Sequence, residues 1–163
     1  MRRLALALAV LIGLAAPAWG QDFAKGLLAY GQRDYATAAK WFRLAGEQGD
    51  PAAQLGLGHM YEKGLGVPHD HAEAVKWYRK AAEQDEALAQ TSLGFMYGKG
   101  RGVPQDYVQA HMWYDLAASR FPPGKGHDVA VKSRDILAAK MTPAQIAEAQ
   151  RLARDWKSKK EGK

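Results

Sequence analysis

Apolar residues between positions 51 and 84 recur every three to four residues, which is typical of helices buried on one side. A first helix is predicted by four apolar residues at i, i+4, i+7 and i+8: Ala53, Leu57, Met60 and Tyr61. Gly64 follows and suits the left-handed position at a helix C-terminus, while Pro68 forces Val67 into an extended conformation. A second helix starts at Asp70, and its apolar face is made by Ala74, Trp77, Tyr78, Ala81 and Ala82. The pattern therefore predicts a helical hairpin.

The same pattern returns 36 residues later along the chain. Between 51–84 and 87–120, 17 of 34 positions are identical, and a period of this length indicates a helical solenoid. The second half of the unit also occurs once upstream, at Asp34, Ala38, Trp41, Phe42 and Ala45. Because a single hairpin cannot bury its apolar face alone, successive hairpins must stack on one another.

The repeated residues resemble a known family. The pattern A-x-x-x-L-G-x-x-Y-x-x-G-x-G-V-x-x-D-x-x-x-A-x-x-W-Y-x-x-A-A is matched by Ala53 to Ala82 and by Ala89 to Ala118, and it resembles the Sel1-like repeat, a relative of the tetratricopeptide repeat. The resemblance implies an all-α fold, a short right-handed α-solenoid of helical hairpins. Its units are expected at about 23–50, 51–86 and 87–120. The first unit lacks the G-x-G-V loop, so a tight turn is expected there.

The C-terminal part of the chain leaves the repeat pattern. The segment Phe121-Pro122-Pro123-Gly124 breaks the solenoid, and two helices are predicted beyond it, at about 126–140 and 142–158. Thr142 and Gln145 form a capping-box sequence at the start of the second helix. The two helices are expected to cover the exposed end of the last repeat, as the solubility of a solenoid requires. The repeat domain would then span 21–158, followed by a basic tail, 159–163.

The first twenty residues have the layout of a cleaved signal peptide. Arg2 and Arg3 precede an apolar run of eleven residues, Leu4 to Leu14, and small residues follow at Ala18 and Gly20. The run is far shorter than the roughly 20 residues that span a bilayer. We therefore expect cleavage after Gly20, a periplasmic or secreted protein, and no membrane span in the mature chain.

The composition narrows the function classes. The chain has no cysteine, so disulfides, thiol catalysis and cysteine metal sites are excluded. Loss of Arg2 and Arg3 with the leader would lower the net charge from +6 to +4, with 21 Lys and Arg against 17 Asp and Glu. So mild a basic excess in an exported protein does not predict a nucleic-acid partner. The basic tail is expected to be a frayed, solvated end, with contact to an anionic surface as the alternative.

Asp34, Asp70 and Asp106 occupy equivalent places at predicted helix starts and are interpreted as N-caps, like Thr142. Glu73 lies three residues after Asp70, and Gln109 lies three residues after Asp106. A capping box is therefore expected at both aspartates, with the later side chain reaching back to the cap.

The motif His69-Asp70-His71 raises the question of a metal site. The equivalent positions of the next unit hold Gln105 and Tyr107, so the histidines are not part of the repeat. They are expected to face water, with an adventitious metal contact as the alternative. Gly64 and Gly66 do not predict a phosphate site, because they follow a helix C-terminus, whose dipole repels anions. No cofactor and no metal are predicted, and no catalytic motif singles out an active site.

A binding surface is the remaining candidate for function. By resemblance to tetratricopeptide-like solenoids, the first helix of each hairpin should line the concave face. The exposed residues predicted there, with Leu27 as a further member, are Tyr30, Leu55, His59, Glu62, Lys63, Thr91, Phe95 and Lys99. Aromatic and aliphatic anchors of this kind bind peptides or helices. The competing interpretation is that adjacent helices bury Leu55 and Phe95.

The resemblance implies a non-catalytic adaptor, because members of the family act as scaffolds in multiprotein assemblies, including those of the cell envelope. We therefore expect a monomeric module that binds an unknown peptide or protein partner. The alternative is a small periplasmic enzyme or accessory factor that acts on a cell-wall or exopolysaccharide polymer. It would require His59, Glu62 or another acid beside a pocket with a perturbed pKa.

Overall fold

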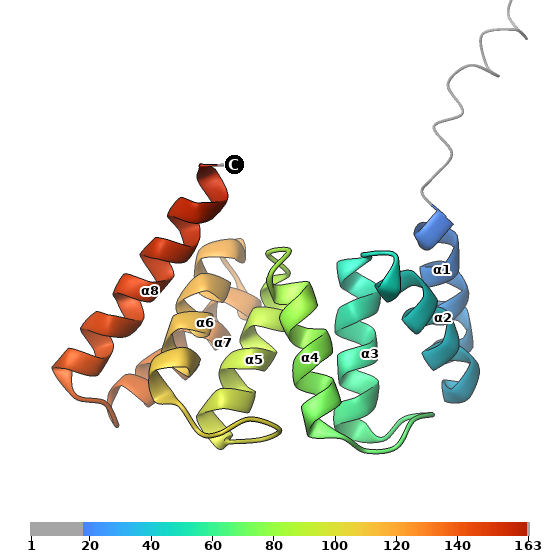
Figure 1. Ribbon diagram of the computed structural model, residues 1–163, viewed down its shortest axis with the longest axis horizontal. Coiled ribbons are helices and arrows are strands. Elements are labelled where there is room, and N and C mark those ends of the chain that lie inside the picture. Colours follow the sequence, from blue (N-terminus) through green and yellow to red (C-terminus); the bar gives the residue numbers. More distant parts are fainter. Residues whose placement is uncertain (1–17, 163) are drawn as a thin grey trace, which may run out of the picture.

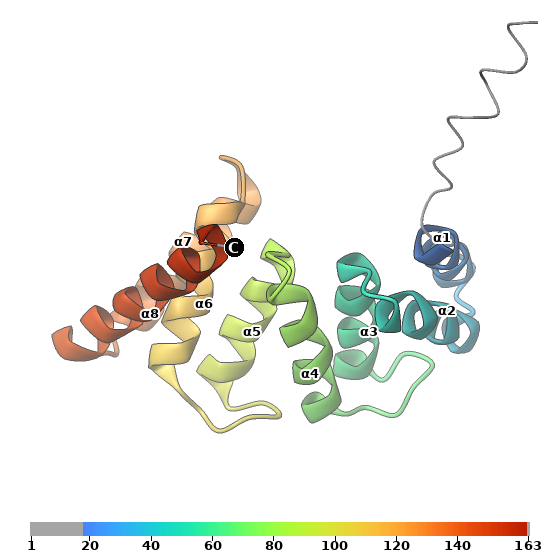
Figure 2. The same ribbon diagram turned by 45° about the horizontal axis from the view of Figure 1, so that its top comes forward.

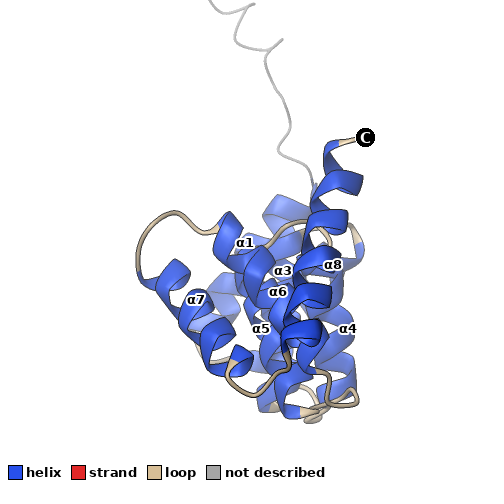
Figure 3. Cartoon of the chain, turned by 90° about the vertical axis from the view of Figure 1, so that its left-hand side faces the viewer, coloured by secondary structure: helices blue, strands red, loops and turns tan. Residues whose placement is uncertain are grey.

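The computed structural model describes residues 18–162, and this part of the chain consists of helices joined by short loops (Figure 1). Figure 3, coloured by secondary structure, shows helices and connecting loops throughout this region. The all-helical fold confirms the predicted fold class. The helices are α1 (Ala18–Gly31), α2 (Tyr35–Glu47), α3 (Pro51–Lys63), α4 (His71–Ala82), α5 (Ala87–Lys99), α6 (Tyr107–Arg120), α7 (Lys125–Ala138) and α8 (Pro143–Glu161).

The helices α1 to α6 follow one another in chain order from one end of the molecule, and α8 lies at the other end (Figures 1 and 2). Within each unit the two helices pack as a hairpin, and the second helix packs on the first helix of the next unit. Each unit thus shares its core with its neighbours. One core cluster joins α2, α3 and Trp77 of α4, and a second joins α4, α5 and α6.

The long loops of the second and third hairpins are contacts between units. Gly64 and Gly66 both have positive φ, at 66° and 68°. A Cβ on Gly66 would lie 2.2 Å from the backbone carbonyl carbon of Tyr35, at the start of α2. A Cβ on Gly102 would lie about as close to the backbone of His71, at the start of α4. Only glycine at these two positions lets the loop approach the preceding unit so closely.

Buried glutamines join the units by hydrogen bonds that the sequence pattern did not single out. Gln54 of α3 donates to the carbonyl oxygen of Gly46 at 2.8 Å. Gln90 of α5, its equivalent 36 residues later, donates to the carbonyl of Ala82 at 3.2 Å. In both cases the acceptor lies in the last turn of the preceding helix, where carbonyl groups lack intrahelical partners. The repeated glutamine thus ties the end of one unit to the first helix of the next.

The N-caps differ in part from the prediction. Asp34, Asp70 and Asp106 each accept backbone N–H groups of the helix that follows. The capping boxes predicted at Asp70 and Asp106 are wrong, because the backbone N–H groups of these residues donate to the carbonyls of Tyr61 and Tyr97 instead. Only Thr142, among the described helix starts, forms the reciprocal box, with Gln145. In both units, the hydrogen bond to the first helix of the hairpin thus takes the place of the expected bond within the second helix.

The turn between α1 and α2 is three residues long, against seven between α3 and α4, as the missing G-x-G-V loop predicted. Two caps escaped the sequence analysis. Asp50 caps α3 and accepts from the backbone N–H of Ala53 at 2.9 Å, and Glu86 caps α5.

The two C-terminal helices both pack on α6 rather than forming a fourth tight pair. Arg134 of α7 donates to Asp115 of α6 at 3.0 Å. Trp156 of α8 meets Trp113 of α6 edge to face, with ring centroids 5.1 Å apart. The helix α7 also contacts α5, and thus takes the place that the first helix of a fourth unit would occupy.

The basic tail is not a separate frayed end over the described residues, because α8 continues through 159–161. Lys160 donates to the carbonyl of Glu83 and lies 3.5 Å from Asp85, which holds the end of α8 on the α4–α5 turn. At the other terminus, the predicted leader lies outside the described residues up to position 17, and Gly20 lies in the first turn of α1. Every helix within 18–162 is too short or too polar to span a bilayer.

Candidate functional site

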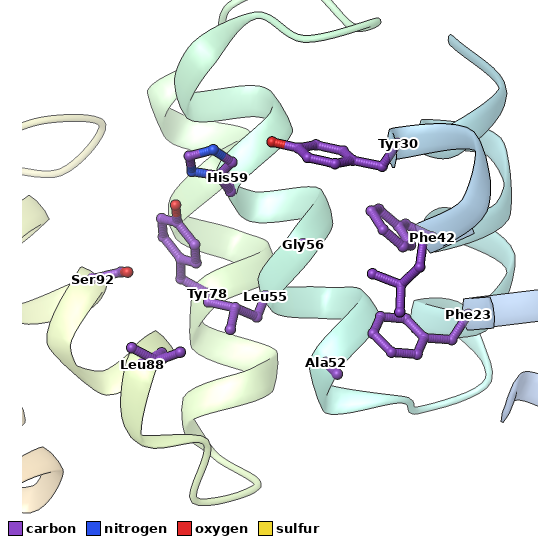
Figure 4. Close-up of a pocket in the computed structure, with 11 residues that line it drawn as sticks. Phe23, Tyr30, Phe42, Ala52, Leu55, Gly56, His59, Tyr78, Leu88 and Ser92 are labelled. Atoms are coloured by element: carbon purple, nitrogen blue, oxygen red, sulfur yellow. The ribbon is translucent and has the colours of Figure 1, made fainter. Parts of the chain in front are cut away.

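A concave cavity of about 430 Å³ lies between α1, α3 and α5, and we call it the groove. Figure 4 shows aromatic rings of the first unit on one side and side chains of α3, α4 and α5 on the other. The groove is mainly apolar, with His59 and Ser92 as polar members. Its lining residues are Phe23, Leu27, Tyr30, Phe42, Ala52, Leu55, Gly56, His59, Tyr78, Leu88 and Ser92.

Two of these aromatic residues reach the groove from the second helix of a hairpin. Phe42 lies over Gly26 and Gly56, where a Cβ would come within 2.4 and 3.1 Å of the ring. Tyr78, its equivalent 36 residues later, lies over Gly58 in the same way. The missing side chains leave gaps between the first helices, and the rings pass through them. Glycine in α1 and α3 thus serves close packing, although it weakens a helix intrinsically.

Leucines on both sides leave the groove apolar and accessible. Leu27 of α1 is 51% exposed, and Leu88 of α5 is 52% exposed. Exposed apolar side chains that converge on one concavity are more informative than scattered ones. The groove therefore has the composition of a site for apolar side chains of a ligand.

Tyr78 and Glu62 form a hydrogen-bonded pair between α4 and α3. The phenol of Tyr78 donates to Glu62 at 2.7 Å, and Lys63 donates to the other carboxylate oxygen at 2.9 Å. Burial and the bond to Glu62 raise the pKa of Tyr78. Burial opposes ionisation of Glu62, but the bonds from Tyr78 and Lys63 and the nearby His59 outweigh it and lower the pKa of this carboxyl. Glu62 is thus an ionised acceptor that holds Tyr78 in place.

A second hollow of about 210 Å³ lies further along the first helices, between α5, α6 and α7. Phe95 forms part of its wall, with the guanidinium of Arg101 5.0 Å from the ring centroid. Ile136 is 56% exposed there, and Lys99 and Lys140 line the same hollow. This hollow therefore combines apolar surface with two cations.

The three repeats match the model of a known protein family. The Sel1 repeat model matches residues 23–50, 51–86 and 87–120. The chain belongs to the Sel1 repeat family. A search of curated proteins finds no match.

Two solved structures extend this Sel1 assignment to the fold. A protective antigen present in uropathogenic Escherichia coli strains, which displays an SLR fold, aligns over 86% of this chain with a TM-score of 0.78 and 33% identity. This chain spans 30% of the length of that protein. A Sel1 repeat protein from Oxalobacter formigenes aligns over 75% of this chain and 89% of its own length, with a TM-score of 0.62 and 32% identity.

Sel1 repeat proteins are generally protein-interaction modules, and the family is typically non-catalytic. The first helix of each Sel1 unit contributes to the groove, since α1, α3 and α5 all line it. Tyr30, Leu55 and His59 lie in the groove, whereas Phe95 and Lys99 lie in the second hollow. The residues predicted to form one binding surface are thus divided between two concavities.

Several predicted residues are less exposed than the sequence analysis expected. Leu55, His59 and Phe95 are half-buried, and Leu55 and Phe95 pack against the core formed by α4, α5 and α6. Glu62 is half-buried and engaged by Tyr78. A short Sel1 array curves tightly enough for neighbouring first helices to cover each other's sides.

Thr91, Glu62 and Lys63 line neither concavity. The hydroxyl of Thr91 donates to the carbonyl of Ala87 at 3.0 Å, within its own helix. Lys63 is exposed and bound to Glu62. Seven groove residues were not predicted from the sequence, namely Phe23, Phe42, Ala52, Gly56, Tyr78, Leu88 and Ser92. The recurrence of an aromatic residue at 42, 78 and 114 was the available signal, but it was assigned to the core.

His69 and His71 stack edge to face with ring centroids 4.4 Å apart. His69 is exposed and His71 is half-buried, so only the first faces water as fully as expected. Among the described residues, no group of three or more His, Asp or Glu side chains is placed to hold a metal ion. Asp70 between the histidines accepts the backbone N–H groups of Ala72 and Glu73 and acts as a cap.

Proposed function

We propose that this protein is a non-catalytic scaffold of the bacterial cell envelope that holds an apolar segment of a partner protein in the groove. The observation that carries the proposal is the concavity itself, with Leu27 and Leu88 about half exposed on its two sides. The leader-like sequence at residues 1–20 supports export to the periplasm. Binding in the groove and export to the periplasm are tested by separate experiments.

The lining favours a peptide or helix with two or more apolar anchors. A cavity of about 430 Å³ accommodates a few large side chains, and aromatic walls supply contact area at low cost in side-chain entropy. His59 and Ser92 offer hydrogen bonds to the backbone or a polar side chain of the ligand. Lys99 and Lys140 in the second hollow favour a carboxylate further along the same segment.

The alternative function, an enzyme acting on an envelope polymer, rests on His59 and Glu62. Glu62 has a lowered pKa and accepts hydrogen bonds from Tyr78 and Lys63, which favours a positioning role over that of a general acid. The alternative predicts that purified protein cleaves peptidoglycan or exopolysaccharide and that Glu62→Gln abolishes the cleavage. The scaffold proposal predicts no such cleavage with either protein.

The groove is tested by selecting a phage-displayed library of random dodecapeptides on the purified protein. Selected peptides should share aromatic or aliphatic anchors, and a chosen peptide should bind the Leu27→Glu, Leu88→Glu double variant at least about tenfold more weakly, since charges then enter an apolar site. Leu28→Glu is the matched control, because Leu28 is 64% exposed, lies next to Leu27 and is outside the groove. Equal binding by both variants would contradict the proposal.

Export is tested in the bacterium by fractionation and N-terminal sequencing of the mature chain. A mature N-terminus at Gln21 in the periplasmic fraction is the expected result. A chain that keeps its first twenty residues, or that stays in the cytoplasm, would contradict the envelope location and leave the groove proposal standing.

A further inference from the structure

The equivalent tryptophans of the three units have different surroundings. Trp77 and Trp113 are buried, with 5% and 2% of their surface exposed. Trp77 packs on the preceding unit, where its Cζ3 lies 3.3 Å from the position of a Cβ on Gly46. Trp41 belongs to the first unit and is only half-buried, with the ammonium of Lys25 4.2 Å from its ring centroid. The contact surface that the second and third units bury is open in the first.

The outer face of α2 carries this open surface. Leu44 is 42% exposed, one helical turn from Trp41 and Lys40. Hollows of about 460 and 410 Å³ lie along this face, and Lys40 and Leu44 line both. The ridges of another helix pack into grooves such as these two hollows, one on each side of the ridge formed by Lys40 and Leu44. We call Lys40, Trp41, Leu44 and Glu47 the α2 face.

The charges of the α2 face are complementary to those of a second copy. Lys40 and Glu47 are both exposed, four residues before and three residues after Leu44. If two copies of α2 pack antiparallel about a twofold axis near Leu44, each Lys40 lies opposite Glu47 of the second copy, and the two leucines meet at the centre. Such an isologous contact uses the same patch twice and closes on itself.

At the other end of the described chain, the equivalent tryptophan is covered. There, α7 and α8 both pack on α6, and Trp156 covers Trp113. Figure 1 shows α1 and α2 at one end of the row of helices and α8 at the other. The open end of one copy therefore meets the open end of another. We propose that two copies of this protein pair through the α2 face, which replaces the monomer expected from the sequence.

The proposal is tested by charge reversal and sedimentation velocity at micromolar concentrations and low salt. The protein itself should sediment as a dimer. Lys40→Glu and Glu47→Lys should each weaken self-association by about tenfold or more, because like charges then face each other twice. The two single variants, when mixed, should pair with each other, and the Lys40→Glu, Glu47→Lys double variant should again form a dimer. Lys132→Glu, an exposed change on α7, is the control and should leave the dimer intact.

Circular dichroism of each variant checks that the helices remain folded. A monomeric parent protein would overturn the proposal. So would a dimer that the single reversals leave unchanged, because the contact would then lie elsewhere. Failure of the mixed single variants to pair, with both folded, would exclude the antiparallel register. None of these outcomes depends on whether the groove binds a peptide.

Discussion

The second unit, 51–86, and the third unit, 87–120, share half of their aligned residues and nearly the same backbone, yet they present different surfaces. Leu57 and Leu93 are fully buried, and Gly58 and Gly94 both lie under a tyrosine ring. Some of the positions that differ lie on the first helices, which line the concavities. His59 is replaced by Phe95, and Glu62 is replaced by Gly98.

The difference separates two kinds of residue. Shared residues build the hairpin and its contact with the preceding unit, because every unit must solve the same packing problem. Residues that differ on the first helices give each concavity its own chemistry. The apolar groove beside the second unit and the cationic hollow beside the third arise in this way.

The largest effect is expected where the units are alike. Gly66→Ala and Gly102→Ala should each lower the free energy of unfolding by about 3 kcal/mol, from the positive φ and from a Cβ placed against the backbone of the preceding unit. Gly49→Ala is the control, because φ is positive there but no atom lies within 4 Å of the Cβ, and it should cost about 1–2 kcal/mol. Urea denaturation followed by circular dichroism measures all three. Equal losses would show that strain alone matters.

A smaller effect should distinguish the two tyrosines. Tyr78→Phe removes a donor to the ionised Glu62 and should cost about 2 kcal/mol. Tyr114→Phe should cost about 1 kcal/mol or less, because Gly98, the equivalent of Glu62, has no carboxylate to accept a hydrogen bond. The same denaturation experiment compares them, and a larger loss for Tyr114→Phe would refute the role given to Glu62.

The smallest effect concerns Val75 and His111, which are equivalent and both buried. Burial lowers the pKa of His111, while Asp115 and Asp135 raise it and Arg134 lowers it further. A lowered pKa in the folded state means that the contribution of His111 is present above about pH 6.5 and lost as the pH falls. His111→Val should therefore flatten the dependence of stability on pH between about 6.5 and 5.

His111→Val should also raise stability at pH 7 by about 1 kcal/mol, since the buried Nδ1 atom of His111 has no hydrogen-bond partner in the described structure. Val75→His is the reverse change in the second unit and should introduce a loss of stability on acidification. Thermal melts across this pH range measure both variants. A parallel pH profile for the parent protein and His111→Val would rule out the assignment.

The candidate site was only partly predictable, for a physical reason that Phe42 and Tyr78 illustrate. Periodicity placed both on the buried side of a second helix, and burial of Phe42 is indeed nearly complete. Their edges nevertheless reach the groove, because Gly26, Gly56 and Gly58 open gaps between the first helices. The apolar pattern of a second helix does not indicate how far apart the two neighbouring first helices lie. Leu88 was missed likewise, since its place in the groove depends on the angle between α3 and α5.

The amino-acid sequence by itself determined the hairpin, its 36-residue period, the stacking of three units and the helices that follow them. These features depend on local geometry: apolar spacing, glycines with positive φ and polar caps each act within a few residues of the chain. Only the tertiary structure decided how far Leu55, His59 and Phe95 are exposed and which carbonyls accept the backbone N–H groups of Asp70 and Asp106. It also decided that Trp41 is half-buried while Trp77 and Trp113 are buried. Those properties depend on neighbours many residues away, and identical local sequences acquire different surroundings at the end of an array and in its middle.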